Sequence, residues 1–429
     1  MARLLLGQTL HFSGDPFSQP WQEVAHHNTH GAVLIENGLI KAVGDADDFR
    51  TNDVEVIDHG TKLITAGFVD AHVHYPQTAM IASWGKRLID WLNTYTFPEE
   101  AKFRDPAYAA EISRMFFDLS LSHGVTTQAS FGTVHPNSVD SFFKEAQSRG
   151  LRTLTGKTCM DRNAPDDLRD TAQTAYDDSK ALLEKWHGVD RLGYVITPRF
   201  TPTSTREQLE ALGALWSEHP ECLMQTHLSE QTEEIAWVRD LVPEARDYLD
   251  TYARTGLLGA RGLYGHAIHL EPRERDVLRD TGAALAHCPT SNTFIGSGLF
   301  DMMRTRRDGI SVGLATDVGG GSSFSILRTM AAAYEVGQLS GSAIHPAQLM
   351  WWATAGSAKA LHLQDQIGNL SAGMEADLIV LDLASTPEID QRQARAQDIW
   401  EAVFPTIMMG DDRAIAQVYV SGNRVDLRK

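Results

Sequence analysis

The sequence predicts an α/β fold, a (β/α)8 TIM-like barrel that carries a small composite β-sandwich domain built from both termini. Three observations lead to this prediction. Short apolar segments alternate with amphipathic segments through the middle of the chain, whereas both ends are rich in short strands and tight turns. Histidine and carboxylate side chains follow several of the apolar segments. Such side chains are expected where the carboxyl ends of barrel strands build a site.

The barrel is expected to span residues 67–372. Asp105 and Pro106 fit the N-cap and first position of one helix, and Gly124 can end that helix. Ser204 with Glu207 predicts a capping box at the start of another helix. Alternation of such helices with apolar strands is typical of a parallel barrel. The strands are predicted at 67–73, 125–131, 151–158, 192–198, 222–227, 262–266, 283–288 and 311–316.

The composite β domain is expected to use residues 1–66 and 373–429. Asn37-Gly38 stands between two apolar runs near the N-terminus and predicts a tight hairpin. Near the C-terminus, residues 377–381 have the character of a strand, and Gly422-Asn423 predicts a second hairpin. Two β-rich ends that flank a different middle favour one small domain built from both.

The composition is that of an ordinary soluble globular protein. The chain has 429 residues, of which 42% are hydrophobic and 22% charged, with a formal net charge of −18. This charge argues against nucleic-acid binding, which needs clustered basic side chains. The run Leu4-Leu5-Leu6 is too short for a signal-peptide core, and we expect no membrane partner. Cys159, Cys222 and Cys288 are widely spaced, so we expect buried free thiols and a cytoplasmic protein.

The pair His72 and His74 is the strongest indication of chemistry. Residues i and i+2 of a strand point to the same side, so both imidazoles can reach one ion. Asp70 shares this parity and can order the site from behind the ligands. Later predicted strands end in further polar groups, namely His227 followed by Glu230, His266, and Asp317.

Three of these imidazoles together with one of the carboxylates would suit a divalent transition metal, with zinc as the leading candidate. Each residue alone has an ordinary explanation. A single histidine at a strand end usually makes a loop hydrogen bond, and Asp317 before three glycines is typical of a turn. Glu230 alone is typical of the first turn of a helix. Their joint position at one face of the barrel favours a metal site.

Longer motifs carry a resemblance to a known family. They are the segments 67–77 (GFVDAHVHYPQ), 91–100 (WLNTYTFPEE), 197–200 (TPRF), 226–230 (THLSE), 264–266 (YGH), 286–292 (AHCPTSN) and 316–320 (TDVGG). Together these motifs resemble the amidohydrolase superfamily and, more narrowly, its guanine deaminase family. Ala66 and Ala71 stand where relatives often carry proline and threonine, and neither position is a predicted ligand.

The resemblance implies the roles of individual residues. One Zn²⁺ per chain is implied, with the ligands His72, His74, His227 and Asp317. The implied catalytic residues are Glu230 as proton shuttle, Asp317, and His266 beside the attacking water. The implied substrate contacts are Gln77, Arg199, Phe200, His266 and Glu230. Tyr75, Trp84 and Trp91 are further candidates for the pocket wall, with core packing as the more common role for the two tryptophans.

The implied reaction is the zinc-dependent hydrolysis of guanine to xanthine and ammonia in purine catabolism or salvage. The implied partner is the small purine itself, and relatives are usually homodimers. Two-metal amidohydrolases use a carboxylated lysine on the fourth strand, but the segment 192–198 contains none. Lys157 falls on the predicted third strand instead. One metal is therefore favoured. Lys157 is expected either to have a structural role or to contact a metal ligand without binding the metal itself.

Two alternatives stay open. The ligand set alone also fits a deaminase or hydrolase of another ring, such as a pterin, a triazine or a cytosine-like base. A different class is a non-catalytic barrel used as an assembly scaffold, although all four predicted ligands and Glu230 are present here. A nucleic-acid deaminase is disfavoured, because the chain lacks both a Cys-x-x-Cys motif and a basic balance of charge.

Overall fold

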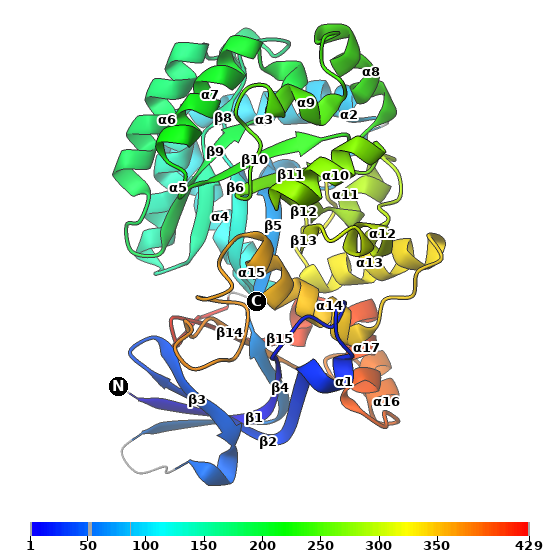
Figure 1. Ribbon diagram of the computed structural model, residues 1–429. Coiled ribbons are helices and arrows are strands. Elements are labelled where there is room, and N and C mark those ends of the chain that lie inside the picture. Colours follow the sequence, from blue (N-terminus) through cyan, green and yellow to red (C-terminus); the bar gives the residue numbers. More distant parts are fainter. Residues whose placement is uncertain (1, 50–53, 86, 428–429) are drawn as a thin grey trace.

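The computed structural model describes residues 2–49, 54–85 and 87–427. They form a barrel of parallel strands surrounded by helices, and a separate mixed sheet drawn from both ends of the chain (Figure 1). The predicted barrel with a small composite β domain from both termini is therefore confirmed. Among the described residues, no helix has the length and hydropathy needed to cross a bilayer.

The barrel strands lie in chain order around the barrel, each parallel to its neighbour. The predicted third strand, 151–158, is divided into β7 and the short β8 (Thr158–Cys159), which also pairs with β9. Most other predicted strand ends lie within two residues of the observed ones. Within the described residues the eight strands of the barrel are β5 (Phe68–His74), β6 (Val125–Phe131), β7 (Thr153–Gly156), β9 (Leu192–Pro198), β10 (Leu223–Leu228), β11 (Gly262–His266), β12 (Ala284–His287) and β13 (Ser311–Leu314).

Backbone and side-chain hydrogen bonds join the last strand segment to the first. The amide of Asp317 donates to the carbonyl of His72 at 2.9 Å, and the amide of His74 donates to the carbonyl of Val318 at 2.8 Å. The carboxylate of Asp70 accepts from the amide of Thr316 at 2.9 Å and from the Thr316 hydroxyl. Asp70 therefore ties the chain just before Asp317 to β5, where two of the predicted ligands lie.

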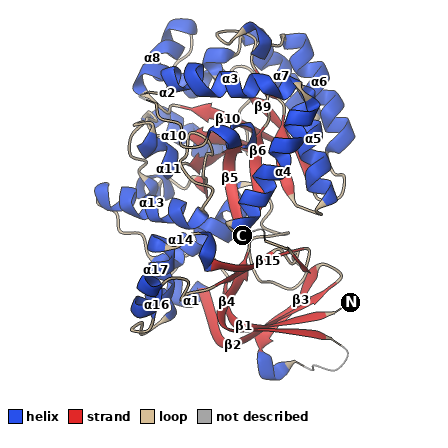
Figure 2. Cartoon of the chain, turned by 180° about the vertical axis from the view of Figure 1, so that it is seen from behind, coloured by secondary structure: helices blue, strands red, loops and turns tan. Residues whose placement is uncertain are grey.

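Helices cover the outside of the barrel (Figure 2). α4 begins as predicted, with the Asp105 side chain accepting from the amide of Ala107, and Gly124 follows its end at a φ of +77°. The predicted capping box at Ser204 is wrong by one residue, because Thr205 is the N-cap of α7 and accepts from the amide of Gln208. The covering helices are α4 (Pro106–Ser122), α5 (Pro136–Ser148), α6 (Ala172–Trp186), α7 (Arg206–Glu218), α8 (Thr232–Leu241), α9 (Tyr248–Ala253), α10 (Pro272–Thr281), α11 (Pro289–Phe294), α12 (Met302–Arg307) and α13 (Ile326–Leu339).

Shorter helices complete the chain. Figure 2 shows α14, α16 and α17 below the barrel and beside the strands of the second sheet. α2 and α3 lie in the long connection after β5 and are joined by a π-helical segment, Leu92–Thr96. The bounds are α1 (Trp21–Val24), α2 (Leu88–Trp91), α3 (Phe97–Glu100), α14 (Pro346–Trp351), α15 (Ser357–Ala360), α16 (Pro387–Gln393) and α17 (Ile399–Met409).

The second sheet combines strands from both ends of the chain, as predicted. Its strands form one continuous mixed sheet in the order β16-β15-β14-β4-β1-β2-β3, rather than two separate sheets of a sandwich. Asn37 and Gly38 have φ angles of 53° and 79° and make the predicted turn between β2 and β3. The second hairpin turns at Ser421-Gly422, one residue before the predicted pair. The strands are β1 (Arg3–Phe12), β2 (Ala25–Glu36), β3 (Leu39–Asp45), β4 (Glu55–Ala66), β14 (Leu378–Leu381), β15 (Ile415–Val420) and β16 (Asn423–Arg424).

Candidate metal centre and ligand cavity

The four predicted metal ligands converge at the carboxyl ends of the barrel strands. His72 and His74 come from β5 and His227 from β10, and one ring nitrogen of each lies within 4.8 Å of the others. The Nε2 atoms of His74 and His227 are 3.1 Å apart. Oδ1 of Asp317 lies 3.6 Å from Nε2 of both His72 and His74. Three nitrogen ligands and one oxygen therefore face a common point.

The hydrogen bonding of these imidazoles fits a bound cation. Within the described residues, neither ring nitrogen of His72 has a hydrogen-bond partner, and Nδ1 of His74 has none. Burial, reinforced by the neighbouring imidazoles, lowers the pKa of His72, His74 and His227 well below the usual value. They are therefore held as neutral rings, the form that binds metal. Buried polar atoms without partners are costly, and a bound ion would give one nitrogen of the His72 ring a partner.

The backbone orients His227 for coordination. Its Nδ1 lies 2.7 Å from the carbonyl oxygen of Arg199, and only a donor can bond to that oxygen. Nδ1 therefore carries the hydrogen of the neutral ring, and the lone pair of Nε2 faces His74. A hydrogen bond of this kind behind a ligand is common at metal sites.

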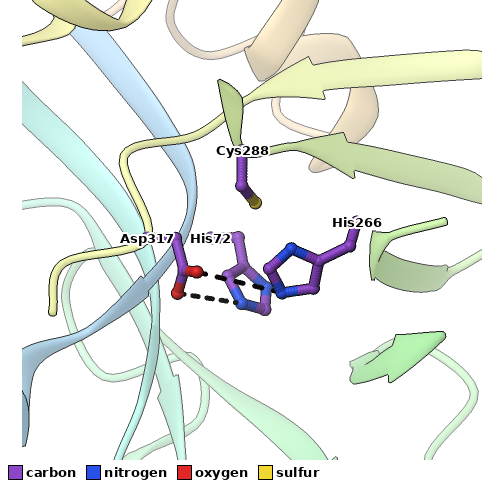
Figure 3. A group of neighbouring side chains, drawn as sticks. All are labelled: His72, His266, Cys288 and Asp317. Carbon is purple, nitrogen blue, oxygen red and sulfur yellow. Dashed lines mark ion pairs between the residues drawn. The ribbon is translucent and has the colours of Figure 1, made fainter. Parts of the chain in front are cut away.

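A second group overlaps the first, with His266 and Cys288 beside His72 and Asp317 (Figure 3). His266 Nε2 lies 3.8 Å from Asp317 Oδ2, and Nδ1 lies 2.9 Å from Oδ1 of Asn292. Burial lowers the pKa of His266, but Glu230, Asp317 and the bond to Asn292 outweigh it and raise the pKa above its usual value. Burial raises the pKa of Cys288 well above its usual value, so the thiol is neutral in the metal-free site.

Close backbone approaches make room for this cluster. A Cβ on Gly265 would lie 2.7 Å from Cε1 of His72, so the glycine before His266 leaves space for the ring. His266 and Asp317 have φ angles of 65° and 49°, in the left-handed region that non-glycine residues rarely adopt. Strained backbone of this kind is concentrated at functional sites.

Glu230 is buried beside the cluster and held from two directions. Its Oε1 accepts from the Ser297 hydroxyl at 2.8 Å, while its Oε2 lies 3.6 Å from Nε2 of His266. Its backbone amide donates to Oε2 of Glu234 at 2.9 Å. One carboxylate oxygen is therefore fixed by Ser297, and the other faces His266.

All the predicted substrate contacts line one cavity beside this cluster. The cavity is polar at the metal centre and lined on other sides by apolar and aromatic groups, an arrangement typical of small-molecule sites. Its polar lining residues are His74, Gln77, Arg199, His227, Glu230, His266 and Asp317, and its apolar ones are Leu88, Trp91, Leu92, Phe200 and Ile295.

Two of the candidate wall residues lie elsewhere. Tyr75 is fully buried, packs against Phe103 and Phe142, and donates its hydroxyl to the carbonyl of Ser138 at 2.6 Å. Tyr75 follows His74 on the chain and so points away from the side that the ligands share. The Trp84 side chain is 72% exposed. The prediction of a pocket contact is wrong for Tyr75 and Trp84, and correct for Trp91.

Lys157 is fully buried at the third strand, where its ammonium group pairs with Asp170. Its charge is thus compensated by Asp170, which agrees with the structural role, one of the two roles expected for Lys157. All three cysteines are buried and unpaired, as predicted.

Three residues at the site have no role in the prediction from sequence. They are Ser297, which bonds to Glu230, Asn292, which bonds to His266, and Glu100, which bonds to both Gln77 and Arg199. Asn292 lies in the motif 286–292 and Glu100 in the motif 91–100. No periodicity or spacing in these motifs distinguishes the two residues from their polar neighbours.

Comparison with known proteins gives concordant matches over nearly the whole chain. A family model described as "Amidohydrolase family" matches residues 63–425. A guanine deaminase of Escherichia coli (strain K12) is 42% identical over 398 residues, which cover 92% of this chain and 91% of the relative. A probable guanine deaminase of Deinococcus radiodurans is 37% identical and covers 98% of each chain.

Solved structures agree with these sequence matches. The structure of E. coli guanine deaminase superimposes with a TM-score of 0.97 at 40% identity and covers 100% of both chains. A guanine deaminase from C. acetobutylicum with guanine bound in its active site has a TM-score of 0.90 at 27% identity, covering 99% of this chain and 100% of the other.

Proposed function

The chain belongs to the amidohydrolase family, and we propose that it hydrolyses guanine to xanthine and ammonia. One observation carries this proposal. A single cavity joins the cluster of metal-binding side chains to an arginine and a glutamine, in a chain whose relatives are named guanine deaminase. One of those relatives holds guanine in its active site.

The family is metal-dependent, and we propose one zinc ion per chain bound by His72, His74, His227 and Asp317. The unpaired ring nitrogens and the set of three nitrogens and one oxygen support this choice. When bound, zinc lowers the pKa of a coordinated water toward about 7 and so supplies a strong nucleophile near neutral pH.

The protein side chains carry the protons of the proposed reaction. Water adds to C2 of guanine, the bond from C2 to the exocyclic nitrogen breaks, and ammonia leaves. Asp317 accepts a proton from the attacking water. Glu230 passes one proton of the water to a ring nitrogen, which makes C2 more electrophilic. The second water proton, the one accepted by Asp317, is then delivered through Glu230 to the departing amine, so both water protons are accounted for. His266 faces both carboxylates and is placed to hydrogen-bond the attacking oxygen.

Three other residues are proposed to hold the purine. Arg199 and Gln77 offer hydrogen-bond donors at the cavity wall, and a purine edge with acceptors satisfies them. Phe200 is buried at the same wall, with its ring edge-on to His227, and offers an apolar surface to a flat ring. A site built to hydrogen-bond one edge rejects analogues that leave its groups unpaired.

The proposal is tested by ammonia release from guanine, adenine, cytosine, a pterin amine and a triazine amine, with the products identified by chromatography. We expect release from guanine with formation of xanthine, and far slower release from the other rings. Release from a different ring alone would overturn the choice of substrate while leaving a metal hydrolase. No release from any ring, in protein that binds no metal, would instead support an assembly scaffold.

We also propose that the enzyme is a cytoplasmic homodimer that acts in purine catabolism or salvage. The buried unpaired cysteines agree with a reducing compartment. Light scattering of the purified protein measures the oligomeric state, and a monomeric mass would contradict this part of the proposal.

A further inference from the structure

Glu100, at the end of α3, is a fully buried carboxylate that joins two residues of the cavity wall. Its Oε2 accepts from Nη1 of Arg199 at 2.6 Å, and its Oε1 accepts from Nε2 of Gln77 at 3.0 Å. Glu100 itself is not among the residues that line the cavity. It therefore lies behind the two side chains proposed to hold the purine.

The ion pair fixes the guanidinium of Arg199. Both partners are almost completely buried, and removing such charges from water is costly unless they are paired. The guanidinium also lies over the ring of Phe97, with its carbon 5.6 Å from the ring centre. Within the described residues, the hydrogen bonds of this guanidinium all use Nη1. The donors on Nε and Nη2 are left for a ligand.

The same carboxylate fixes which way the amide of Gln77 points. A carboxylate only accepts hydrogen bonds, so the group facing Oε1 of Glu100 must be the NH2 of Gln77. On the other side of the amide, Oε1 of Gln77 accepts from the backbone amide of Gly319 at 3.3 Å. The amide is held between an acceptor and a donor, and its second N–H remains available.

The result is a wall that offers hydrogen-bond donors. Guanine presents two neighbouring acceptors, O6 and N7, and arginine commonly binds this pair. An amino group at C6 replaces the acceptor O6 by a donor and would face donors of the wall. Such a mismatch is penalised because buried polar groups stay unpaired.

We propose that Glu100 is a positioning residue that makes the site selective for an oxygen at C6 of the purine. This inference rests on the proposed function and adds the origin of its substrate selectivity. Loss of the carboxylate would free the amide of Gln77 to turn its oxygen toward the substrate and would loosen the guanidinium. The first change offers an acceptor to an amine at C6. The second change weakens the hydrogen bonds to O6 and N7 of guanine, so both lower the preference for guanine.

The test compares guanine with 2,6-diaminopurine, which keeps the amine at C2 but carries an amine at C6. Glu100→Gln preserves shape and removes the charge. Glu99→Gln is the matched control, because Glu99 stands next to Glu100 but bonds to Lys102 and Tyr108. Kinetics are measured on protein of equal zinc content, with products identified so that loss of the C2 amine is counted.

We expect wild-type protein to prefer guanine, and Glu100→Gln to lower this preference in kcat/KM by about tenfold or more, mainly through the KM for guanine. The control should keep the wild-type ratio. An equal loss on both substrates, with the ratio unchanged, would overturn the inference and leave Glu100 a merely structural residue. If the Gln variant does not fold, Glu100→Asp applies the same test, because it keeps the charge but withdraws the carboxylate by one methylene.

The two proposals fail in different ways. Wild-type protein that releases no ammonia from guanine would refute the proposed function, and this inference with it. Wild-type protein that is active on guanine, with an unchanged ratio in the Glu100 variants, would refute only the role of Glu100.

Discussion

Replacing Glu230 by glutamine removes the proposed proton carrier with little change of shape. The new amide can still accept the hydrogen bond of Ser297, which is 2.8 Å from Oε1 in the wild-type structure. Glutamine cannot carry a proton between the ring nitrogen and the leaving amine. The variant should therefore bind guanine but turn it over slowly.

The size of the effect follows from this single loss. General acid–base catalysis contributes roughly 10²–10⁴-fold, so kcat should fall by that factor, equivalent to about 3–5 kcal/mol of transition-state stabilisation. The KM for guanine should change by no more than about threefold, because the hydrogen bonds of the purine to Arg199 and Gln77 remain.

The assay is steady-state ammonia release from guanine, with zinc content measured for each protein. Glu233→Gln is the matched control, since Glu233 is a nearby exposed glutamate that pairs with Arg87. A kcat within about threefold of wild type, in variant protein that carries zinc, would refute the role of Glu230.

Three further predictions address the support of Glu230, the metal centre and the core. Ser297→Ala should lower kcat by about tenfold, because one hydrogen bond to a charged group is lost; kinetics equal to wild type would contradict this. Zinc added to metal-free protein at about 100 times its Kd should stabilise it by about 2.7 kcal/mol, seen as a higher Tm, and His72→Ala should abolish the shift. An equal shift in that variant would argue against His72 as a ligand. Leu263 lies inside the barrel and is 1% exposed. Leu263→Ala should lower the free energy of unfolding, measured with denaturant, by about 2–5 kcal/mol. A loss below about 1 kcal/mol would show that the core readily collapses around the gap.

The sequence predicted most strongly those features that depend on local periodicity. The two-residue spacing of His72 and His74 fixes a common side on any strand, so their convergence needed no knowledge of packing. The positions of His227 and Asp317 followed once the strands were assigned to a parallel barrel, because strand ends then share one face. The hairpin at Asn37-Gly38 was equally local.

Features that depend on packing were not predictable in the same way. Glu99 and Glu100 are neighbours in the sequence, and only the fold decides that Glu100 turns toward Arg199 while Glu99 bonds to Lys102. Trp84 is as apolar as Trp91, but it is exposed whereas Trp91 lines the cavity.

Neighbouring residues can also offer equally good local signals. Ser204 and Thr205 are both good N-cap residues, and the helix begins one residue later than the capping-box pattern suggested. Ser297 lies between Gly296 and Gly298, both with positive φ angles, in a loop with no pattern that places its hydroxyl on Glu230.

The most direct test of the central claim is one experiment on purified protein. Ammonia and xanthine formed from guanine are measured before chelation, after removal of metal, and after zinc is restored. The account predicts equal amounts of both products, loss of both on chelation, and recovery with about one zinc per chain. Full turnover of guanine by protein shown to be free of metal would contradict it.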